Sequence, residues 1–377
     1  MIARVIVDIR NSEVDKIFDY IVPDGMNLHA GDRVRVPFGK RDTEGFCIAL
    51  SEGSEVSSSR LKPIKERLDA FTCVNPDMLA LMEFMRRKFY LRYADCLRLF
   101  VPPQMRGGKV GELKRLYVEL VDGADAKIAD IPARAKRRLE LVERLKKGGE
   151  YLSVLAEEYG AATINALVEA GIAVKTDRSV YRKPYADMET SAKKVSPTDD
   201  QKRAVESIFS TDKTVSLLFG VTGSGKTEVY MEAIERTLAE GKKAIMLVPE
   251  ISLTPQTLRN FRARFSGRVA LMHSGLGVGE RYDEWKRALT GEADIVVGAR
   301  SAVFAPLDNV GLIILDEEHD GSYVSESNPR YDAATIAEFR VRQAGGKLVL
   351  GSATPSIDSF EAAQEGRYNL IVMDKRI

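Results

Sequence analysis

Cysteine is scarce in this chain of 377 residues, which contains only Cys47, Cys73 and Cys96. The count is odd, and no two of these cysteines have the C-x-x-C spacing of a zinc module. This pattern argues against a disulfide framework of the kind found in secreted proteins. We expect reduced thiols in a cytoplasmic protein and no zinc site within this chain.

A membrane-directed segment and an excess of one charge are also missing. Met1–Arg10 carries Arg4, Asp8 and Arg10 within a short apolar pattern, which fits neither a signal peptide nor a membrane span. The formal net charge is only +1, so any surface that binds nucleic acid has to be local. The apolar content of 44% is enough for sizeable cores, and the length suits two or three domains.

The strongest positive signal is a glycine-rich loop between a predicted strand and a predicted helix. Val215–Phe219 is an apolar run typical of a buried parallel strand. Tyr230, Ile234 and Leu238 then recur at helical spacing. The loop between them has the pattern G-x-x-x-x-G-K-[ST], in which backbone N–H groups wrap phosphate oxygens at a helix N-terminus. The predicted ATP-binding residues are Gly220, Val221, Thr222, Gly223, Ser224, Gly225, Lys226 and Thr227.

Acidic residues at a later strand end complete a predicted catalytic set. Lys226 can reach the β- and γ-phosphates, and the Thr227 hydroxyl can hold Mg²⁺. The apolar run Leu312–Leu315 ends in Asp-Glu-Glu-His. Carboxylates at this end of a strand lie beside the phosphate loop. Asp316 is suited to a second Mg²⁺ contact, through water, and Glu317 to orienting the attacking water. Lys226, Asp316 and Glu317 are therefore the predicted catalytic residues.

A third box follows the predicted strand Leu348–Leu350 and reads Gly-Ser-Ala-Thr-Pro. Together with the phosphate loop and the acidic box, it makes this half of the chain similar to the superfamily 2 helicases. Gln201 lies upstream, where that superfamily reads adenine, and its amide can both donate and accept. His319 is either a structural histidine or a residue that couples nucleotide state to Gln or Ser neighbours.

Two loops are candidates for contacts with the DNA backbone. Pro249–Gln256 contains Thr254, and Gly298–Phe304 contains Arg300; each follows a predicted strand. Hydroxyls, amides and one guanidinium at strand ends can grip phosphates without reading sequence. The alternative is that both are ordinary connecting loops.

The fold class predicted is multidomain. Residues 1 to about 105 favour a small β-barrel-like domain followed by one helix over Met78–Leu99. Its predicted strands are Ala3–Ile9, Phe18–Val22, Arg33–Pro37 and Gly45–Leu50. Residues 196–377 favour an α/β, RecA-like P-loop lobe with a parallel sheet. Its predicted strands are Val215–Phe219, Ala244–Val248, Val269–Met272, Asp294–Val297, Leu312–Leu315 and Leu348–Leu350.

Residues 112 to about 185 have the outline of a winged helix. The predicted elements are helices over Ala133–Lys147, Leu152–Tyr159 and Thr163–Ala170 and a hairpin over Ile172–Arg182. The first helix carries seven basic residues: Arg134, Lys136, Arg137, Arg138, Arg144, Lys146 and Lys147. They form either a DNA contact or a solvated face.

The combined motifs resemble the PriA family of primosomal replication-restart helicases, over essentially the whole chain. The matching stretches are Gly220–Tyr230, Val248–Gln256, His273–Leu276, Asp316–Asp320, Phe18–Tyr20 and Gly31–Gly39. The resemblance implies an ATP- and Mg²⁺-dependent 3′ to 5′ DNA helicase that recognises stalled or repaired forks and initiates primosome assembly. It also implies an N-terminal domain that captures the 3′ end of a nascent strand, with Phe18, Asp19, Gly39 and Lys62 in its pocket. The implied partners are fork and single-stranded DNA, a single-stranded DNA-binding protein and other primosome proteins, with no membrane.

Two departures from the family pattern stand out. Val324 and Ala334 take the places of basic residues in a loop thought to couple DNA to ATP, which predicts weaker coupling. The chain also stops at Ile377, before the family's zinc modules and second RecA-like lobe, so it is expected to bind ATP and fork DNA but not to unwind. Two alternatives stay open: a nucleotide-switched DNA-binding module, and another superfamily 2 translocase, against which Phe18–Tyr20 argues.

Overall fold

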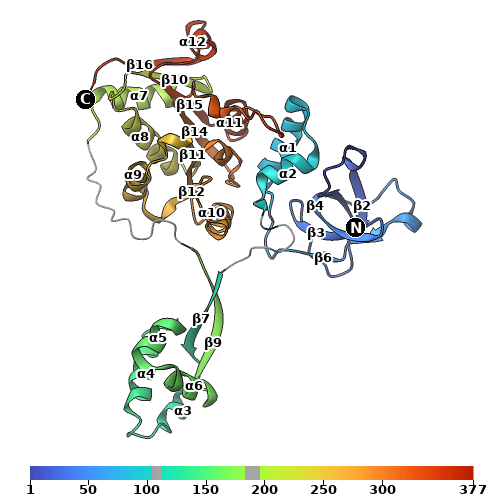
Figure 1. Cartoon of the computed structure of the whole chain (residues 1–377), viewed down its shortest axis with the longest axis vertical. Helices are drawn as coiled ribbons and strands as arrows, with labels where there is room; N and C mark the ends of the chain where they lie inside the picture. Colours follow the sequence, from blue (N-terminus) through green and yellow to red (C-terminus); the bar gives the residue numbers. More distant parts are fainter. Residues whose placement is uncertain (104, 106–112, 183–195, 377) are drawn as a thin grey trace. The chain divides into compact units, whose positions relative to one another are not determined.

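The computed structural model describes residues 1–103, 105, 113–182 and 196–376 (Figure 1). The chain divides into two compact units, one from residues 1–110 with 184–377 and one from residues 111–183. Among the described residues, no helix combines the length and apolar character needed to cross a bilayer.

The first unit begins with a six-stranded sheet in the order β5-β2-β1-β4-β3-β6. Its strands are β1 (Ile2–Val7), β2 (Ile17–Ile21), β3 (Arg33–Phe38), β4 (Arg41–Ser51), β5 (Lys62–Pro63) and β6 (Glu66–Arg67). The two edge strands come from one short segment, Lys62–Arg67, so the sheet is curled. Its inner face buries a small core that includes Val5, Val34, Val36 and Cys47. The four predicted strands are confirmed, with shifted ends.

The single helix predicted over Met78–Leu99 is wrong. The structure has two helices, α1 (Pro76–Phe89) and α2 (Tyr93–Phe100). Helix α1 ends because Tyr90 adopts a left-handed backbone conformation, with φ 55°. Apolar periodicity runs through both helices, so it does not reveal a break that depends on one backbone angle.

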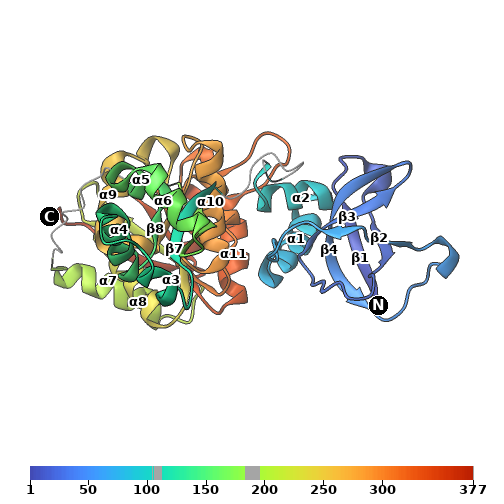
Figure 2. The same cartoon turned by 90° about the horizontal axis from the view of Figure 1, so that it is seen from below.

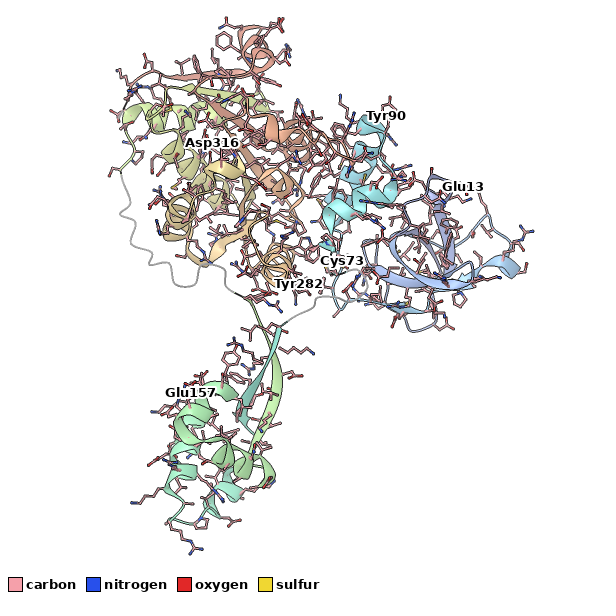
Figure 3. All side chains as sticks on the ribbon, in the orientation of Figure 1. Glu13, Cys73, Tyr90, Glu157, Tyr282 and Asp316 are labelled. Atoms are coloured by element: carbon pink, nitrogen blue, oxygen red, sulfur yellow. The ribbon has the colours of Figure 1, made fainter. Side chains whose placement is uncertain are left out.

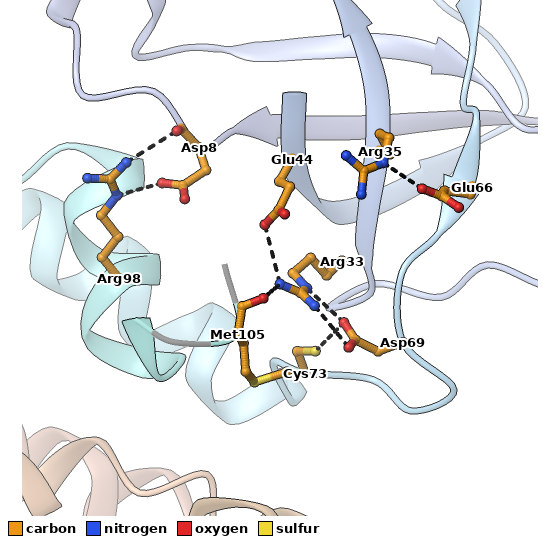
Figure 4. A network of polar contacts seen from close by, with 9 residues as sticks. All are labelled: Asp8, Arg33, Arg35, Glu44, Glu66, Asp69, Cys73, Arg98 and Met105. Carbon is orange, nitrogen blue, oxygen red and sulfur yellow. Dashed lines mark hydrogen bonds and ion pairs between the residues drawn. The ribbon is translucent and has the colours of Figure 1, made fainter. Parts of the chain in front are cut away.

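Buried polar contacts fasten these elements to one another (Figure 4). The Arg33 guanidinium donates to both carboxylate oxygens of Asp69, at 2.8 and 3.0 Å, and also to Glu44 and the Met105 carbonyl. Arg98 of α2 donates to the Asp8 carboxylate at 2.6 Å, just beyond β1. Because a buried guanidinium needs partners for its N–H groups, these contacts fix α2 and the segment after the sheet (Figure 4). Figure 2 shows α1 and α2 beside the N-terminal sheet.

The lobe is built on a seven-stranded sheet, β12-β13-β11-β14-β15-β10-β16, in which every pairing is parallel. Its strands are β10 (Val215–Gly220), β11 (Lys243–Leu247), β12 (Val269–Met272), β13 (Ile295–Gly298), β14 (Val310–Asp316), β15 (Lys347–Ser352) and β16 (Asn369–Met373). Its helices are α7 (Asp199–Ser210), α8 (Lys226–Ala239), α9 (Pro255–Phe265), α10 (Val278–Thr290), α11 (Ala333–Gln343) and α12 (Ile357–Gln364). The six predicted strands and the α/β lobe are confirmed, whereas β16 was not predicted.

Helices cover both faces of this sheet, as the near-continuous apolar strands require. Neighbouring residues alternate between the faces: Leu218 packs in the core under α7, α8 and α9, and Leu217 packs in the core under α10 and α11. The second core continues into α1 and α2, where Phe84 stacks on Phe339 with ring centroids 4.1 Å apart. The Trp285 indole N–H donates to the Phe100 carbonyl at 2.8 Å.

The second unit holds a three-stranded antiparallel sheet, β8-β7-β9, and four helices. Its elements are β7 (Leu113–Leu120), α3 (Asp125–Ala129), α4 (Lys136–Lys146), β8 (Glu150–Tyr151), α5 (Leu152–Tyr159), α6 (Ala161–Glu169) and β9 (Ala173–Val180). The three predicted helices are found, but the hairpin over Ile172–Arg182 is wrong. That segment is one strand, and it pairs with β7 from the start of the unit. Alternation alone identifies a strand and not its partner.

Candidate nucleotide and DNA sites

The phosphate loop lies between β10 and the first residue of α8. Gly223 and Gly225 both have φ of +82°, a conformation that favours glycine and turns the loop tightly. Among the described residues no side chain caps α8, so N–H groups at the start of the helix can face an anion. The Lys226 ammonium is buried and donates to the Gly220 carbonyl at 2.7 Å, across the loop. A bound phosphate would offer Lys226 a charged partner in place of that carbonyl.

Asp316 stands at the end of β14 and is marked in Figure 3. Tyr230 donates its hydroxyl to Asp316 Oδ1 at 2.9 Å, and the Tyr323 hydroxyl donates to the Asp316 carbonyl at 2.6 Å. Burial raises the pKa of the Asp316 carboxyl above its usual value, and the hydrogen bond from Tyr230 opposes that rise. An uncapped helix start, a lysine, the Thr227 hydroxyl and this carboxylate form a donor set that fits a triphosphate with Mg²⁺.

The remaining residues of the acidic box connect β14 to the Ser-Ala-Thr box. Glu317 has φ of 47°, which turns the chain sharply and leaves its side chain about one-third exposed. Glu318 accepts hydrogen bonds from the Ser356 N–H at 2.7 Å and the Ser359 hydroxyl at 3.1 Å. The carboxylate therefore binds the first turn of α12, a favourable place for an anion.

His319 contacts the Ser-Ala-Thr box directly. Its Nδ1 lies 2.8 Å from the Ser352 hydroxyl and its Nε2 lies 3.4 Å from the Thr354 hydroxyl. Its Nδ1 is also 3.8 Å from the Glu317 carboxylate. These contacts fit both hypotheses for His319, since hydroxyl partners would also hold a structural histidine, and its role stays a prediction.

Gln201 is buried in the first turn of α7 and reaches the phosphate loop. Its side-chain oxygen accepts from the Thr198 N–H at 2.7 Å, and its amide nitrogen donates to the Gly225 carbonyl at 3.2 Å. A hollow of about 670 Å³ lies beside the loop and is lined by Ser224, the start of α7 and the segment after β16. That adenine is read by Gln201 stays a prediction.

The two loops predicted to contact DNA come together at the sheet edge. A hollow of about 340 Å³ is lined by Pro249, Glu250, Ile251, Ala299, Arg300, Ser301, Asp320 and Ser322. Arg300 donates to the Ser322 and Val324 carbonyls at 2.9 and 2.7 Å, so it braces the loop after the acidic box. Thr254 caps α9 by accepting from the Thr257 N–H at 3.2 Å. These contacts lie within the protein, and DNA binding by Arg300 and Thr254 stays a prediction.

The N-terminal sheet carries a separate hollow of about 810 Å³. All four residues predicted for a 3′-end pocket line it: Phe18, Asp19, Gly39 and Lys62. Sequence reasoning missed three further basic residues in the lining: Arg4, Lys16 and Arg60. They come from three separate segments and have no common motif. The Asp19 carboxylate accepts a hydrogen bond from the Ser54 hydroxyl, and Phe18 packs edge-on against Phe38 with centroids 5.1 Å apart.

The basic helix of the second unit keeps most of its charge exposed. Arg134, Lys136, Arg137 and Arg138 are exposed, whereas Arg144 pairs with Glu150 at 2.8 Å. Lys146 pairs with Glu143 at 2.7 Å. Arg134 precedes α4, Lys136, Arg137 and Arg138 lie in its first turn, and Lys147 is exposed at its end. These exposed side chains are able to contact a phosphate backbone.

The parallel sheet and the phosphate loop define a member of the P-loop NTPase class. The family described as the PriA 3′DNA-binding domain (3′BD) matches residues 4–102, and the DEAD/DEAH box helicase family matches residues 198–363. The chain belongs to the PriA family of replication restart proteins.

Curated relatives support this assignment along the chain. The chain is 35% identical over 449 aligned positions to replication restart protein PriA of Bacillus subtilis, covering 100% of this chain and 56% of the relative. It is 33% identical over 376 positions to the Haemophilus influenzae protein, covering 96% and 50%. The chain thus spans about half the length of the curated relatives it matches. The solved structure of RecG bound to a three-way DNA junction matches 49% of this chain and 24% of that one, with 24% identity and a TM-score of 0.36.

Proposed function

We propose that this chain provides the fork-binding and ATP-binding parts of a 3′ to 5′ DNA helicase that restarts replication at stalled or repaired forks and initiates primosome assembly. The observation that carries the proposal is that one compact unit holds two candidate sites. One is the phosphate loop with its acidic box, and the other is the basic hollow of the N-terminal sheet, which contains Asp19. The partners inferred are fork and single-stranded DNA, a single-stranded DNA-binding protein and other primosome proteins, all in the cytoplasm.

The residues of the ATP site have separable roles. Lys226 would bind the β- and γ-phosphates, and Thr227 and Asp316 would hold Mg²⁺. Glu317 orients the attacking water, and Gln201 reads the adenine. Mg²⁺, when bound, neutralises charge that develops on the phosphate oxygens. His319 couples Glu317 to Ser352 and Thr354, which precede α12 in the chain.

The DNA contacts are proposed at two sites. In the lobe, Arg300 lines a hollow at the carboxyl ends of parallel strands, where α/β proteins bind their ligands. Thr254, at the start of α9, is proposed as a second contact to the DNA backbone. In the N-terminal sheet, Lys62 and its basic neighbours attract phosphates, and the Asp19 carboxylate accepts a hydrogen bond from a terminal 3′-hydroxyl. The hydrophobic ring of Phe18 can stack on the last base.

For the 377 residues taken by themselves, we expect binding of ATP and DNA without strand separation. In two-lobed helicases the second lobe supplies an arginine finger worth about 10³–10⁵ in turnover. The described residues build one such lobe. Val324 and Ala334, in place of basic residues, are expected to weaken the coupling of DNA to ATP further.

A titration of forked DNA with and without ATP and Mg²⁺ tests the proposal. We expect the fork to bind in both conditions, since the N-terminal hollow does not require nucleotide. A module that uses nucleotide as a switch would bind in only one condition, with a difference well above tenfold. A translocase of another kind would bind forks with and without a free 3′ end at the branch equally well. Fluorescence anisotropy measures all of these affinities.

The exposed basic residues of the second unit lead to a separate prediction. Replacing Arg137 and Arg138 together by alanine is expected to weaken DNA binding without regard to sequence. The plot of log affinity against log salt should become shallower by up to about two units, one for each lost phosphate contact. The matched control is Arg144→Ala, which removes a charge already paired with Glu150. Unchanged affinity and slope would make the exposed part of α4 a solvated face.

A further inference from the structure

Tyr230 is a buried tyrosine that the phosphate-loop motif does not account for. It lies on α8, three residues after Thr227, and only 1% of it is exposed. Its hydroxyl donates to Asp316 Oδ1 at 2.9 Å. The side chain thus joins the helix that begins at the phosphate loop to the carboxylate at the end of β14.

The hydroxyl also lies against the strand of the third box. A Cβ placed on Gly351 would lie 1.8 Å from the Tyr230 hydroxyl oxygen, so a side chain there is incompatible with this position of the ring. Gly351 pairs with Asp316 in the sheet and its carbonyl accepts from the Glu318 N–H at 3.0 Å. The tyrosine hydroxyl therefore occupies the point where α8, β14 and β15 meet.

A phenylalanine would fill the same space without a polar atom. Burying a hydroxyl costs free energy unless it is hydrogen-bonded, and the contact that the structure records for this one is with the Asp316 carboxylate. A hydrogen bond from a fixed donor restricts the rotation of an aspartate carboxylate about its Cβ–Cγ bond to one orientation. Orientation of this kind by a neighbouring group raises the affinity of a metal ligand.

Resting on the ATP site proposed above, we propose that Tyr230 is a positioning residue for Mg²⁺. It fixes the rotation of the Asp316 carboxylate, so that this carboxylate would present its oxygens to a hydrated ion beside the triphosphate in one orientation. Tyr230 contacts neither the nucleotide nor the ion in this arrangement, and it acts through Asp316. Because its helix begins at Lys226, any shift of the phosphate loop reaches the carboxylate through the same side chain.

Calorimetry of Tyr230→Phe in the full 377-residue chain tests this role, with a non-hydrolysable ATP analogue as the probe. The affinity is measured in EDTA and at increasing Mg²⁺. The variant is expected to need about tenfold more Mg²⁺ for half-maximal tightening, the loss of one hydrogen bond to a charged group, with little change in EDTA. Tyr282→Phe, a buried tyrosine on α10, is the matched control and should leave the Mg²⁺ requirement unchanged.

Gly351→Ala provides a second variant, because the added methyl group would displace the Tyr230 hydroxyl. Where it folds, it should raise the Mg²⁺ requirement as Tyr230→Phe does, and the double variant should be no worse than the poorer single one. An unchanged Mg²⁺ requirement in Tyr230→Phe would overturn the inference and leave the ATP site standing. Equal weakening with and without Mg²⁺ would also overturn it, since the role would then be packing of the loop. If the unaltered chain binds no analogue at all, the proposed ATP site itself is wrong.

Discussion

Replacing Lys226 by alanine is expected to weaken ATP binding by about 10- to 150-fold, because hydrogen bonds to charged groups contribute roughly 1.5–3 kcal/mol. The structure holds this ammonium in the phosphate loop, with Gly220 as its partner at 2.7 Å. Loss of the side chain removes the only lysine of the loop without altering its glycines. Isothermal titration calorimetry with ATP and Mg²⁺ measures the change.

Lys202→Ala is the control for the Lys226 variant. Lys202 lies on α7, is largely exposed and forms an ion pair with Asp199 at 3.5 Å. The Lys202→Ala substitution removes a charge of the same sign outside the phosphate loop, so the affinity for ATP should not change. An unchanged affinity in Lys226→Ala, with its melting temperature preserved, would place the nucleotide elsewhere.

The convergence of the candidate ATP-site residues could be predicted from sequence because these residues are local or lie at strand ends. Gly220 to Thr227 form one contiguous loop, and Asp316 ends a strand whose apolar run is plain in the sequence. In a parallel sheet the carboxyl ends of the strands lie along one edge, so motifs that follow different strands are expected to lie close together in space. The contact of His319 with Ser352 follows the same geometry.

What the sequence did not reveal depends on contacts between distant segments or on single backbone angles. Nothing in the local pattern links Tyr230 to Asp316 or explains why Gly351 is a glycine. The break between α1 and α2 rests on the left-handed conformation of Tyr90, labelled in Figure 3. Strand β9 alternates like half of a hairpin, although its partner is β7.

The edge strand β16 is a different kind of omission. Asn369–Met373 is short and apolar, and it follows a helix, which are the features used for the other strands of the lobe. It pairs with β10, and the Val221 N–H donates to the Met373 carbonyl at 3.3 Å. The strand therefore supports the phosphate loop from the side, a role that its own residues do not indicate.

The N-terminal hollow was predicted by resemblance and not from the pattern of its residues. Phe18 and Asp19 lie on β2, while Gly39 directly follows β3 and Lys62 begins β5. These positions meet because the sheet curls until β5 pairs with β2. Strand alternation gives the face of each residue and not the curvature that joins them.

Asp19→Ala is expected to reduce binding of forks with a free 3′-hydroxyl at the branch by about tenfold or more, the contribution of one hydrogen bond to a charged group. Binding of the same fork with a 3′-phosphate should change little, because that end has no 3′-hydroxyl to donate a hydrogen bond to the carboxylate. Asp19 holds the Ser54 hydroxyl in this structure, and a 3′-hydroxyl would take its place. Fluorescence anisotropy with the two forks measures the ratio of affinities.

Two further variants separate recognition of the 3′ end from general electrostatics. Asp24→Ala removes an exposed carboxylate outside the lining of the hollow and should alter neither affinity. Ser54→Ala removes the competing donor, so it should preserve or strengthen the preference for a 3′-hydroxyl. Lys62→Ala should weaken both forks alike, since its charge acts on phosphates that both carry. If Asp19→Ala also weakens both forks by the same factor, the carboxylate supports the shape of the hollow and does not read the terminal hydroxyl.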